Sequence, residues 1–277
     1  MNSRLGKLIR SVQSEFGGLK EAKDTFYYRS RKLLARPHER DFLALRFIPD
    51  ELPGCYVDVG ANHGQSIESI KLMKPFARVC SYEANTLLAE RLIARYRNRP
   101  DVTMYPFGLA DEERRRTLYV PKYKGYVYDG LASFDKSSAA SWLGPDTLYW
   151  FSPAELTLLE TSCVTRRLDD QGLQPVLVKI DVQGYEYQVI KGGIETIRNH
   201  EPVLLIEDFH WEHEMGTLLR QVGYEQYLFD RDGFYPSRHD KVINAFLMTR
   251  RRAATVRMSR RVTEGKLPDL SKRGVSS

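Results

Sequence analysis

The sequence predicts an α/β fold, in which a mostly parallel sheet has helices on both of its faces. Two observations lead to this prediction. From residue 55 onward, short apolar runs alternate with segments whose apolar residues recur at helical spacing. The chain has 277 residues, 42% hydrophobic and 28% charged, which suits one domain with a full core and shorter appendages and excludes a disordered or fibrous protein.

The elements follow in chain order. The expected parallel strands are 56–59, 79–82, 102–106, 176–180 and 203–206. The expected helices between them cover 67–73, 88–96 and 189–197. After the fifth strand, a further helix ends near Gly223, since glycine often terminates helices. We expect the segments 224–229 and 242–248 to form an antiparallel pair at one edge of the sheet.

Both ends of the chain are basic, whereas its middle is acidic. Residues 1–40 carry ten Lys or Arg against four acids, residues 250–277 carry nine against two, and residues 41–249 carry 23 against 30. Residues 1–50 are predicted to be a basic helical extension, and its first apolar face contains Leu5, Leu8, Ile9 and Val12. We expect the ends either to attach the protein peripherally to the anionic inner surface of a membrane or to act as solvated tails. Nucleic acid is not an expected partner, because no basic face is predicted across the folded body.

Targeting signals and disulfide bonds are not expected. The longest aliphatic run, 203–206, is far below the roughly 20 residues of a membrane span, and no hydrophobic stretch follows Met1. Cys55, Cys80 and Cys163 are widely spaced, which favours free thiols in a reducing, cytoplasmic compartment. Without a C-x-x-C pair, a structural zinc site is not expected either.

The segment 111–169 interrupts the alternation of strands and helices. It is too long for a simple connection and contains nine aromatic residues that the fold class does not require: Tyr119, Tyr123, Tyr126, Tyr128, Phe134, Trp142, Tyr149, Trp150 and Phe151. These rings either line a substrate cleft or pack a small subdomain.

Ligands of an open parallel sheet bind beyond the carboxyl ends of its strands. After the first strand, Gly60 and Gly64 allow the backbone to approach a ligand, and the following helix offers free N–H groups. Glu83 ends the second strand, 23 positions after Gly60, where a carboxylate can accept both hydroxyls of an adenosine ribose. The glycines alone are equally compatible with a plain strand-to-helix turn. Together with Glu83, they predict a cofactor that contains adenosine.

Asn62 bears on the choice of cofactor. Dinucleotide sites have a glycine at this place so that a pyrophosphate can come close. Asn62 would crowd a pyrophosphate but not the methionyl end of S-adenosylmethionine. We therefore expect S-adenosylmethionine, and a nicotinamide-dependent oxidoreductase is the alternative because Gly60 and Glu83 also fit it.

Four motifs in order resemble the FkbM family of S-adenosylmethionine-dependent methyltransferases. They are the turn 58–64, Tyr82-Glu83-Ala84-Asn85, the segment 178–186 and Leu205-Ile206-Glu207. The resemblance covers residues 52–249 and departs at Gln183, where the family usually has Glu. It implies a class I methyltransferase (Rossmann-like) domain at 51–249 with seven strands, the last antiparallel, followed by a basic tail at 250–277. The cofactor site that we expect comprises Asp58, Gly60, Asn62, Gly64, Ser66 and Glu83, with Gly108, Leu109 and Ala110 at the adenine.

The acceptor site is expected at the ends of the fourth and fifth strands. A sugar or aliphatic hydroxyl needs a general base or a metal ion to become nucleophilic. Asp181 ends the fourth strand, while Glu207, Asp208 and His210 follow the fifth, about 5 Å away if the strands are neighbours. The predicted catalytic residues are Asp181, Asp208 and His210. Asp181, Glu207 and Asp208 are also the predicted ligands of a Mg²⁺ ion, and without a metal Asp181 or His210 would be the base.

The expected function is O-methyl transfer from S-adenosylmethionine to a hydroxyl of a glycan, glycolipid or natural product. The acceptor class comes from the range of the family and from the aromatic insert, since aromatic rings stack on sugars. Besides the oxidoreductase, a non-catalytic membrane-surface protein is an alternative. The sequence leaves the acceptor and assembly into a homo-oligomer open.

Overall fold

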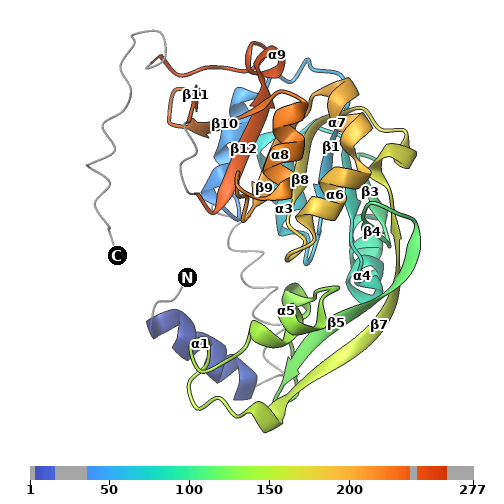
Figure 1. Ribbon diagram of the computed structural model, residues 1–277, viewed down its shortest axis with the longest axis vertical. Helices are drawn as coiled ribbons and strands as arrows, with labels where there is room; N and C mark the ends of the chain where they lie inside the picture. Colours follow the sequence, from blue (N-terminus) through green and yellow to red (C-terminus); the bar gives the residue numbers. More distant parts are fainter. Residues whose placement is uncertain (1–3, 16–35, 238–241, 261–277) are drawn as a thin grey trace.

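The computed structural model describes residues 4–15, 36–237 and 242–260 (Figure 1). These residues form an eight-stranded sheet, in the order β11-β10-β12-β9-β8-β1-β2-β3, and a four-stranded sheet, in the order β4-β7-β5-β6. The strands of the large sheet are β1 (Cys55–Val59), β2 (Val79–Tyr82), β3 (Val102–Tyr105), β8 (Pro175–Ile180), β9 (Val203–Glu207), β10 (Tyr224–Phe229), β11 (Phe234–Pro236) and β12 (Asn244–Thr249). From β3 to β9 all pairings are parallel, which confirms the predicted fold class.

Helices cover both faces of the large sheet (Figure 1). The helices and 3-10 helices in chain order are α1 (Arg4–Glu15), η2 (Arg40–Phe47), α3 (Gln65–Met73), α4 (Thr86–Tyr96), η3 (Asp129–Leu131), α5 (Lys136–Ser141), η4 (Pro153–Glu155), η5 (Leu168–Gln171), α6 (Glu186–Gly192), α7 (Ile194–His200), α8 (Glu214–Gln221) and α9 (Arg250–Ala253). Alternation along β1 divides the core between the faces, because successive strand residues point to opposite sides. Tyr56 packs with α3, α4 and η2, and Val57 packs with α6, α7 and α8.

One detail of the sheet differs from the prediction. The short strand β11 pairs with β10 and raises the strand count from seven to eight. The expected antiparallel pair near one edge is formed by β10 and β12, and β12 takes the inner position between β9 and β10. The reason is hydrophobicity: Ala245–Thr249 is buried throughout, whereas β10 carries the partly exposed Glu225. The more continuously apolar strand takes the inner position.

The aromatic insert forms the second sheet and a small core of its own. Its strands are β4 (Gly108–Leu109), β5 (Arg114–Tyr123), β6 (Tyr126–Val127) and β7 (Leu156–Arg166). Tyr123 and Tyr128 are buried with Leu143 and Leu148. Rings therefore pack this subdomain, while Trp150 is 80% exposed.

The C-terminal end of the described chain packs against the folded body. Residues 250–253 form α9, in which Arg252 donates hydrogen bonds to the carbonyls of Glu201 (2.7 Å) and His200 (2.9 Å). Residues 261–277 of the predicted tail lie outside the described residues, and the region boundaries stay a prediction. Cys55, Cys80 and Cys163 are buried free thiols. Across the described ranges, no helix is long and apolar enough to span a membrane.

Candidate active site at the carboxyl edge of the large sheet

Three turns with unusual backbone conformations meet at the carboxyl ends of β1, β8 and β9. Asn62 (φ 49°), Gln183 (φ 55°) and Asp208 (φ 51°) follow these strands, and all three adopt left-handed conformations. Such conformations cost residues with side chains on the order of 1–2 kcal/mol each, and they concentrate at functional sites. Three of the six non-glycine residues with positive φ in the described chain therefore lie at the edge that the sequence predicts.

Gly60 joins the turn after β1 to the turn after β8. Its φ is 85°, and a Cβ at this position would lie 1.9 Å from the carbonyl oxygen of Asp181. No larger residue fits unless the backbone moves. The carbonyl of Gly60 also accepts a hydrogen bond from Lys179 Nζ (3.1 Å). The predicted cofactor turn and the predicted acceptor residues are thus in direct contact.

Glu83 holds the turn after β1 in place. Its carboxylate accepts hydrogen bonds from the backbone N–H groups of Asn62 (2.7 Å) and Asn85 (2.8 Å). Burial raises the pKa of Glu83, and the two backbone donors lower it. A carboxylate oxygen can accept a second hydrogen bond, so this group can still receive the hydroxyls of a ribose.

Asn62 offers an unused acceptor beside Glu83. Its Oδ1 is buried and has no hydrogen-bond partner among the described residues. Buried side-chain oxygens are nearly always hydrogen-bonded, so an exception indicates a missing donor. The residues around the turn therefore fit a ligand with both a diol and a polar hydrogen, as S-adenosylmethionine has.

Asp58 and Ser66 lie beneath this turn rather than at its surface. Asp58 is fully buried, and its Oδ2 accepts hydrogen bonds from the hydroxyls of Ser66 (2.8 Å) and Ser81 (2.7 Å). Burial raises the pKa of Asp58, while Lys179, 3.6 Å away, lowers it. The structure places both predicted residues where they support the backbone of the turn.

The segment Gly108, Leu109 and Ala110 belongs to the second sheet. Gly108 and Leu109 form β4, which pairs with β7. Leu109 and Ala110 are buried. A Cβ at Gly108 would lie 3.1 Å from the Cβ of Ala84, the residue that follows Glu83 in the chain.

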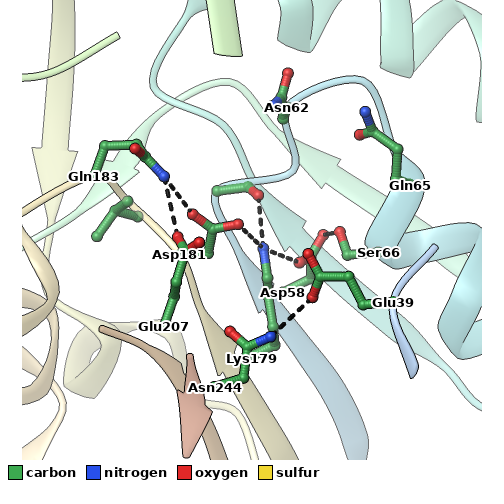
Figure 2. A network of polar contacts seen from close by, with 12 residues as sticks. Glu39, Asp58, Asn62, Gln65, Ser66, Lys179, Asp181, Gln183, Glu207 and Asn244 are labelled. Atoms are coloured by element: carbon green, nitrogen blue, oxygen red, sulfur yellow. Dashed lines mark hydrogen bonds and ion pairs between the residues drawn. The ribbon is translucent and has the colours of Figure 1, made fainter. Parts of the chain in front are cut away.

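Two carboxyl groups and an amide form the acidic side of the site (Figure 2). Gln183 Nε2 donates hydrogen bonds to Asp181 Oδ1 (2.9 Å) and to Glu207 Oε2 (3.1 Å). Lys179, on β8, contributes a salt bridge to Asp181 Oδ2 (3.2 Å). The lysine is only 7% exposed, so it is a buried cation between the acids. We call Asp181 and Glu207 the acid pair, and the side chain of Gln183 its bridging amide.

The pKa values of the two acids are shifted in opposite directions. Burial raises the pKa of Asp181, but the charge of Lys179 and hydrogen bonds from Glu207 and Gln183 outweigh burial and lower it to about 2. Burial, the hydrogen bond with Asp181 and the charge of Asp181 raise the pKa of Glu207 to about 8. At neutral pH, Asp181 is therefore ionised and Glu207 is protonated.

A Mg²⁺ ion does not fit the predicted triad of Asp181, Glu207 and Asp208. The side chain of Asp208 is 88% exposed and pairs with His210 Nε2 (3.2 Å) instead of joining the acid pair. The pair alone supplies two carboxyl groups, and the buried cation Lys179, 3.2 Å from Asp181 Oδ2, opposes a second positive charge there. Within the residues that the structure describes, no three His, Cys, Asp or Glu side chains are placed to hold a metal. The departure of Asp208 follows from its left-handed backbone, which turns it away from β9.

The insert borders both turns of the site. His63, in the turn after β1, lies 3.1 Å from the carboxylate of Asp129. Ser133 donates a hydrogen bond to the carbonyl of Gln183 (3.2 Å). Residues 129–133 thus connect the cofactor turn to the turn that carries the bridging amide.

Comparison with known proteins agrees with this geometry. A family model described as the methyltransferase FkbM domain matches residues 58–227, which is more than half of the chain. The chain belongs to the FkbM methyltransferase family. No curated protein sequence matches it.

Two solved structures are similar to this FkbM protein. The methyltransferase FkbM from Methylobacillus flagellatus KT is 19% identical, with a TM-score of 0.43, over 76% of this chain and 48% of that chain. A precorrin-6y C5,15-methyltransferase from Geobacter metallireducens GS-15 is 12% identical, with a TM-score of 0.34, over 76% of this chain and 84% of that chain. This FkbM protein thus spans about half the length of the first of them.

Sequence reasoning did not single out two residues that lie beside the acid pair, Glu39 and Asn244 (Figure 2). Glu39 Oε2 accepts a hydrogen bond from Asn244 Nδ2 (3.0 Å) at the edge of the acid cluster (Figure 2). Burial raises the pKa of Glu39, and the charge of Lys179 lowers it. Glu39 belongs to the N-terminal extension, for which we expected membrane attachment or a solvated tail, and its sequence carries no signal that it reaches this edge. Lys179 had a signal, since a lysine inside an apolar strand requires a partner acid.

Proposed function

We propose that this protein transfers a methyl group from S-adenosylmethionine to a hydroxyl of a glycan, glycolipid or natural product. The supporting observation is the contact of Gly60 with the carbonyl of Asp181. Through this contact, the turn held by Glu83 and the acid pair form one edge. A methyl donor and an acceptor bound on either side would therefore meet.

The donor side requires positioning more than chemistry. S-adenosylmethionine supplies a methyl group that is already activated for in-line displacement. Glu83 accepts the ribose hydroxyls on its remaining lone pairs, and Asn62 Oδ1 accepts a hydrogen bond from the methionyl amine. Because Glu83 also fixes the backbone of Asn62, one side chain sets both contacts. Holding the reacting atoms in line provides much of the rate.

The acceptor side requires a base, and the acid pair is the proposed one. At neutral pH, Asp181 is the ionised member and receives the hydroxyl proton, while Glu207 stays protonated until pH approaches about 8. The pair titrates as a unit, so each member changes the basicity of the other. Gln183 positions the two carboxyl groups by bonding to both. His210, paired with the exposed Asp208, is a second candidate base.

Binding of S-adenosylhomocysteine, followed by isothermal titration calorimetry, tests the donor site. Glu83→Gln removes the charge that we propose accepts the ribose, so the affinity should fall about tenfold or more. The matched control is Glu186→Gln, because Glu186 also accepts two backbone hydrogen bonds, from Val182 (3.1 Å) and Gly184 (3.2 Å). The control should bind normally. If the wild type fails to bind, or if both variants lose affinity equally, the donor site is wrong.

Acceptor identity is tested in lipid and glycan extracts incubated with the enzyme and labelled S-adenosylmethionine. Mass spectrometry should show a product that is heavier by one methylene group. The label should stay in that product, because an O-methyl ether does not readily release its methyl group. Asp181→Asn should bind S-adenosylhomocysteine as the wild type does but form much less product. If no fraction of any extract gains a methyl group, O-methyl transfer to glycans or lipids is wrong.

A further inference from the structure

The helix α1 contacts the insert through its polar side. Ser11 Oγ accepts a hydrogen bond from the backbone N–H of Tyr149 (2.7 Å), and the hydroxyls of Ser14 and Tyr128 share a hydrogen bond (2.6 Å). Ser11 and Ser14 are 5% and 1% exposed. These hydrogen bonds fix the helix to the insert.

Two apolar residues of α1 face outward. Leu8 and Val12, one helical turn apart, are 45% and 47% exposed. An amphipathic helix that serves only the fold of its own chain buries its apolar side and exposes its serines. The arrangement of α1 is the reverse, so its apolar side is available to another surface.

The charge of α1 indicates what that surface is. The helix carries Arg4, Lys7 and Arg10 against a single acid, Glu15, within a 40-residue region that holds ten basic residues and four acids. Lys7 and Arg10 reach backbone carbonyls of the insert, which keeps their charges beside the helix. A second copy of the same basic helix would be repelled by this charge, whereas anionic lipid headgroups would be attracted.

We propose that the outward side of α1 docks this protein on an anionic membrane surface. Leu8 and Val12 enter the headgroup boundary, and the net positive charge of the helix attracts anionic lipids. Figure 1 shows α1 beside the insert and away from α6, α7 and α8. The insert in turn borders the active site through Asp129 and Ser133. Within the proposed function, on which this step rests, docking favours a lipid-linked acceptor.

Vesicle flotation of the full chain tests the docking surface. Wild-type protein should float with phosphatidylcholine vesicles that contain phosphatidylglycerol and not with phosphatidylcholine alone. The double variant Leu8→Ser and Val12→Ser should bind the anionic vesicles about twentyfold more weakly, since roughly half of each side chain is still to be buried. The matched control is Phe76→Ser with Leu87→Ser, two apolar residues that are 95% and 65% exposed elsewhere on the surface. The control should float as the wild type does.

Several outcomes would overturn docking by α1. In the first, the wild type and the Leu8/Val12 variant float equally well. In the second, the wild type binds neither kind of vesicle. In the third, the wild type is a dimer and the Leu8/Val12 variant is a monomer. Affinity for S-adenosylhomocysteine, measured in the same samples, separates this proposal from the proposed function. Lost flotation with retained affinity assigns the defect to docking, and retained flotation with lost affinity assigns it to the donor site.

Discussion

Replacing Gly60 with alanine tests the contact on which the active site depends. The new Cβ would lie 1.9 Å from the carbonyl oxygen of Asp181 and 3.0 Å from its carbonyl carbon, and both are backbone atoms that cannot rotate away. Gly60 also has a φ of 85°, which costs alanine about 1 kcal/mol or more. Forcing the two turns apart adds about 2 kcal/mol, in the range of other overpacked sites.

The matched control is Gly125→Ala. Gly125 has nearly the same φ, 82°, but nothing lies within 4 Å of the Cβ that alanine would add. This variant therefore has the cost of the left-handed backbone without the steric overlap. Thermal unfolding should show that Gly60→Ala melts about 4–8 °C below Gly125→Ala, because each kcal/mol shifts the midpoint by about 2–4 °C in a chain of this size.

Two results would refute the reasoning about Gly60. Equal melting temperatures of the two variants would show that the turn after β1 does not pack on Asp181 as the structure has it. A lower melting temperature with unchanged affinity for S-adenosylhomocysteine would show that the contact supports the fold but not the cofactor site.

Three further predictions concern the acid pair and its neighbours. Lys179→Met leaves buried carboxylates without their cation and should cost about 3–5 kcal/mol in chemical denaturation, whereas Lys191→Met, which breaks an exposed pair, should change stability little. The pKa of Glu207 is raised from 4.5 to about 8 in the folded state, so the free energy of unfolding should fall as pH rises between these values. Glu207→Gln should flatten this part of the plot of melting temperature against pH. An unchanged plot would contradict the raised pKa of Glu207. Gln183→Glu replaces the bridging donor with a third carboxylate beside Asp181, so its melting temperature should drop below that of the wild type by an amount that grows with pH; a stabilised variant would show that the amide does not bridge the pair.

The strand-end residues were predictable because they belong to local patterns. An apolar strand followed by glycines places Gly60, and a strand that ends in an acid places Glu83 and Asp181, without knowledge of distant contacts. The strand β12 shows the limit of such patterns. Its sequence predicts a strand, but its place between β9 and β10 follows from competition for the inner position of the sheet.

The direction of each side chain at the edge was not predictable. Asp208 follows β9 as expected, yet its left-handed backbone separates it from Glu207, the residue next to it in the chain. A pattern of residue types contains the order of the acids but not the dihedral angles between them. For this reason the structure does not bring the side chain of Asp208 together with those of Asp181 and Glu207.

By itself, the sequence determined the parallel sheet, the glycine turn and the acids at the strand ends, since periodicity and turn chemistry act over a few residues. Only the tertiary structure decided which groups Gln183 bridges and that Leu8 and Val12 of α1 face outward. Lys179 meets the carbonyl of Gly60 across 119 positions, Ser14 meets Tyr128 across 114, and Asn244 meets Glu39 across 205. Contacts at such separations depend on how whole elements pack, and packing is a property of the folded chain rather than of any one segment.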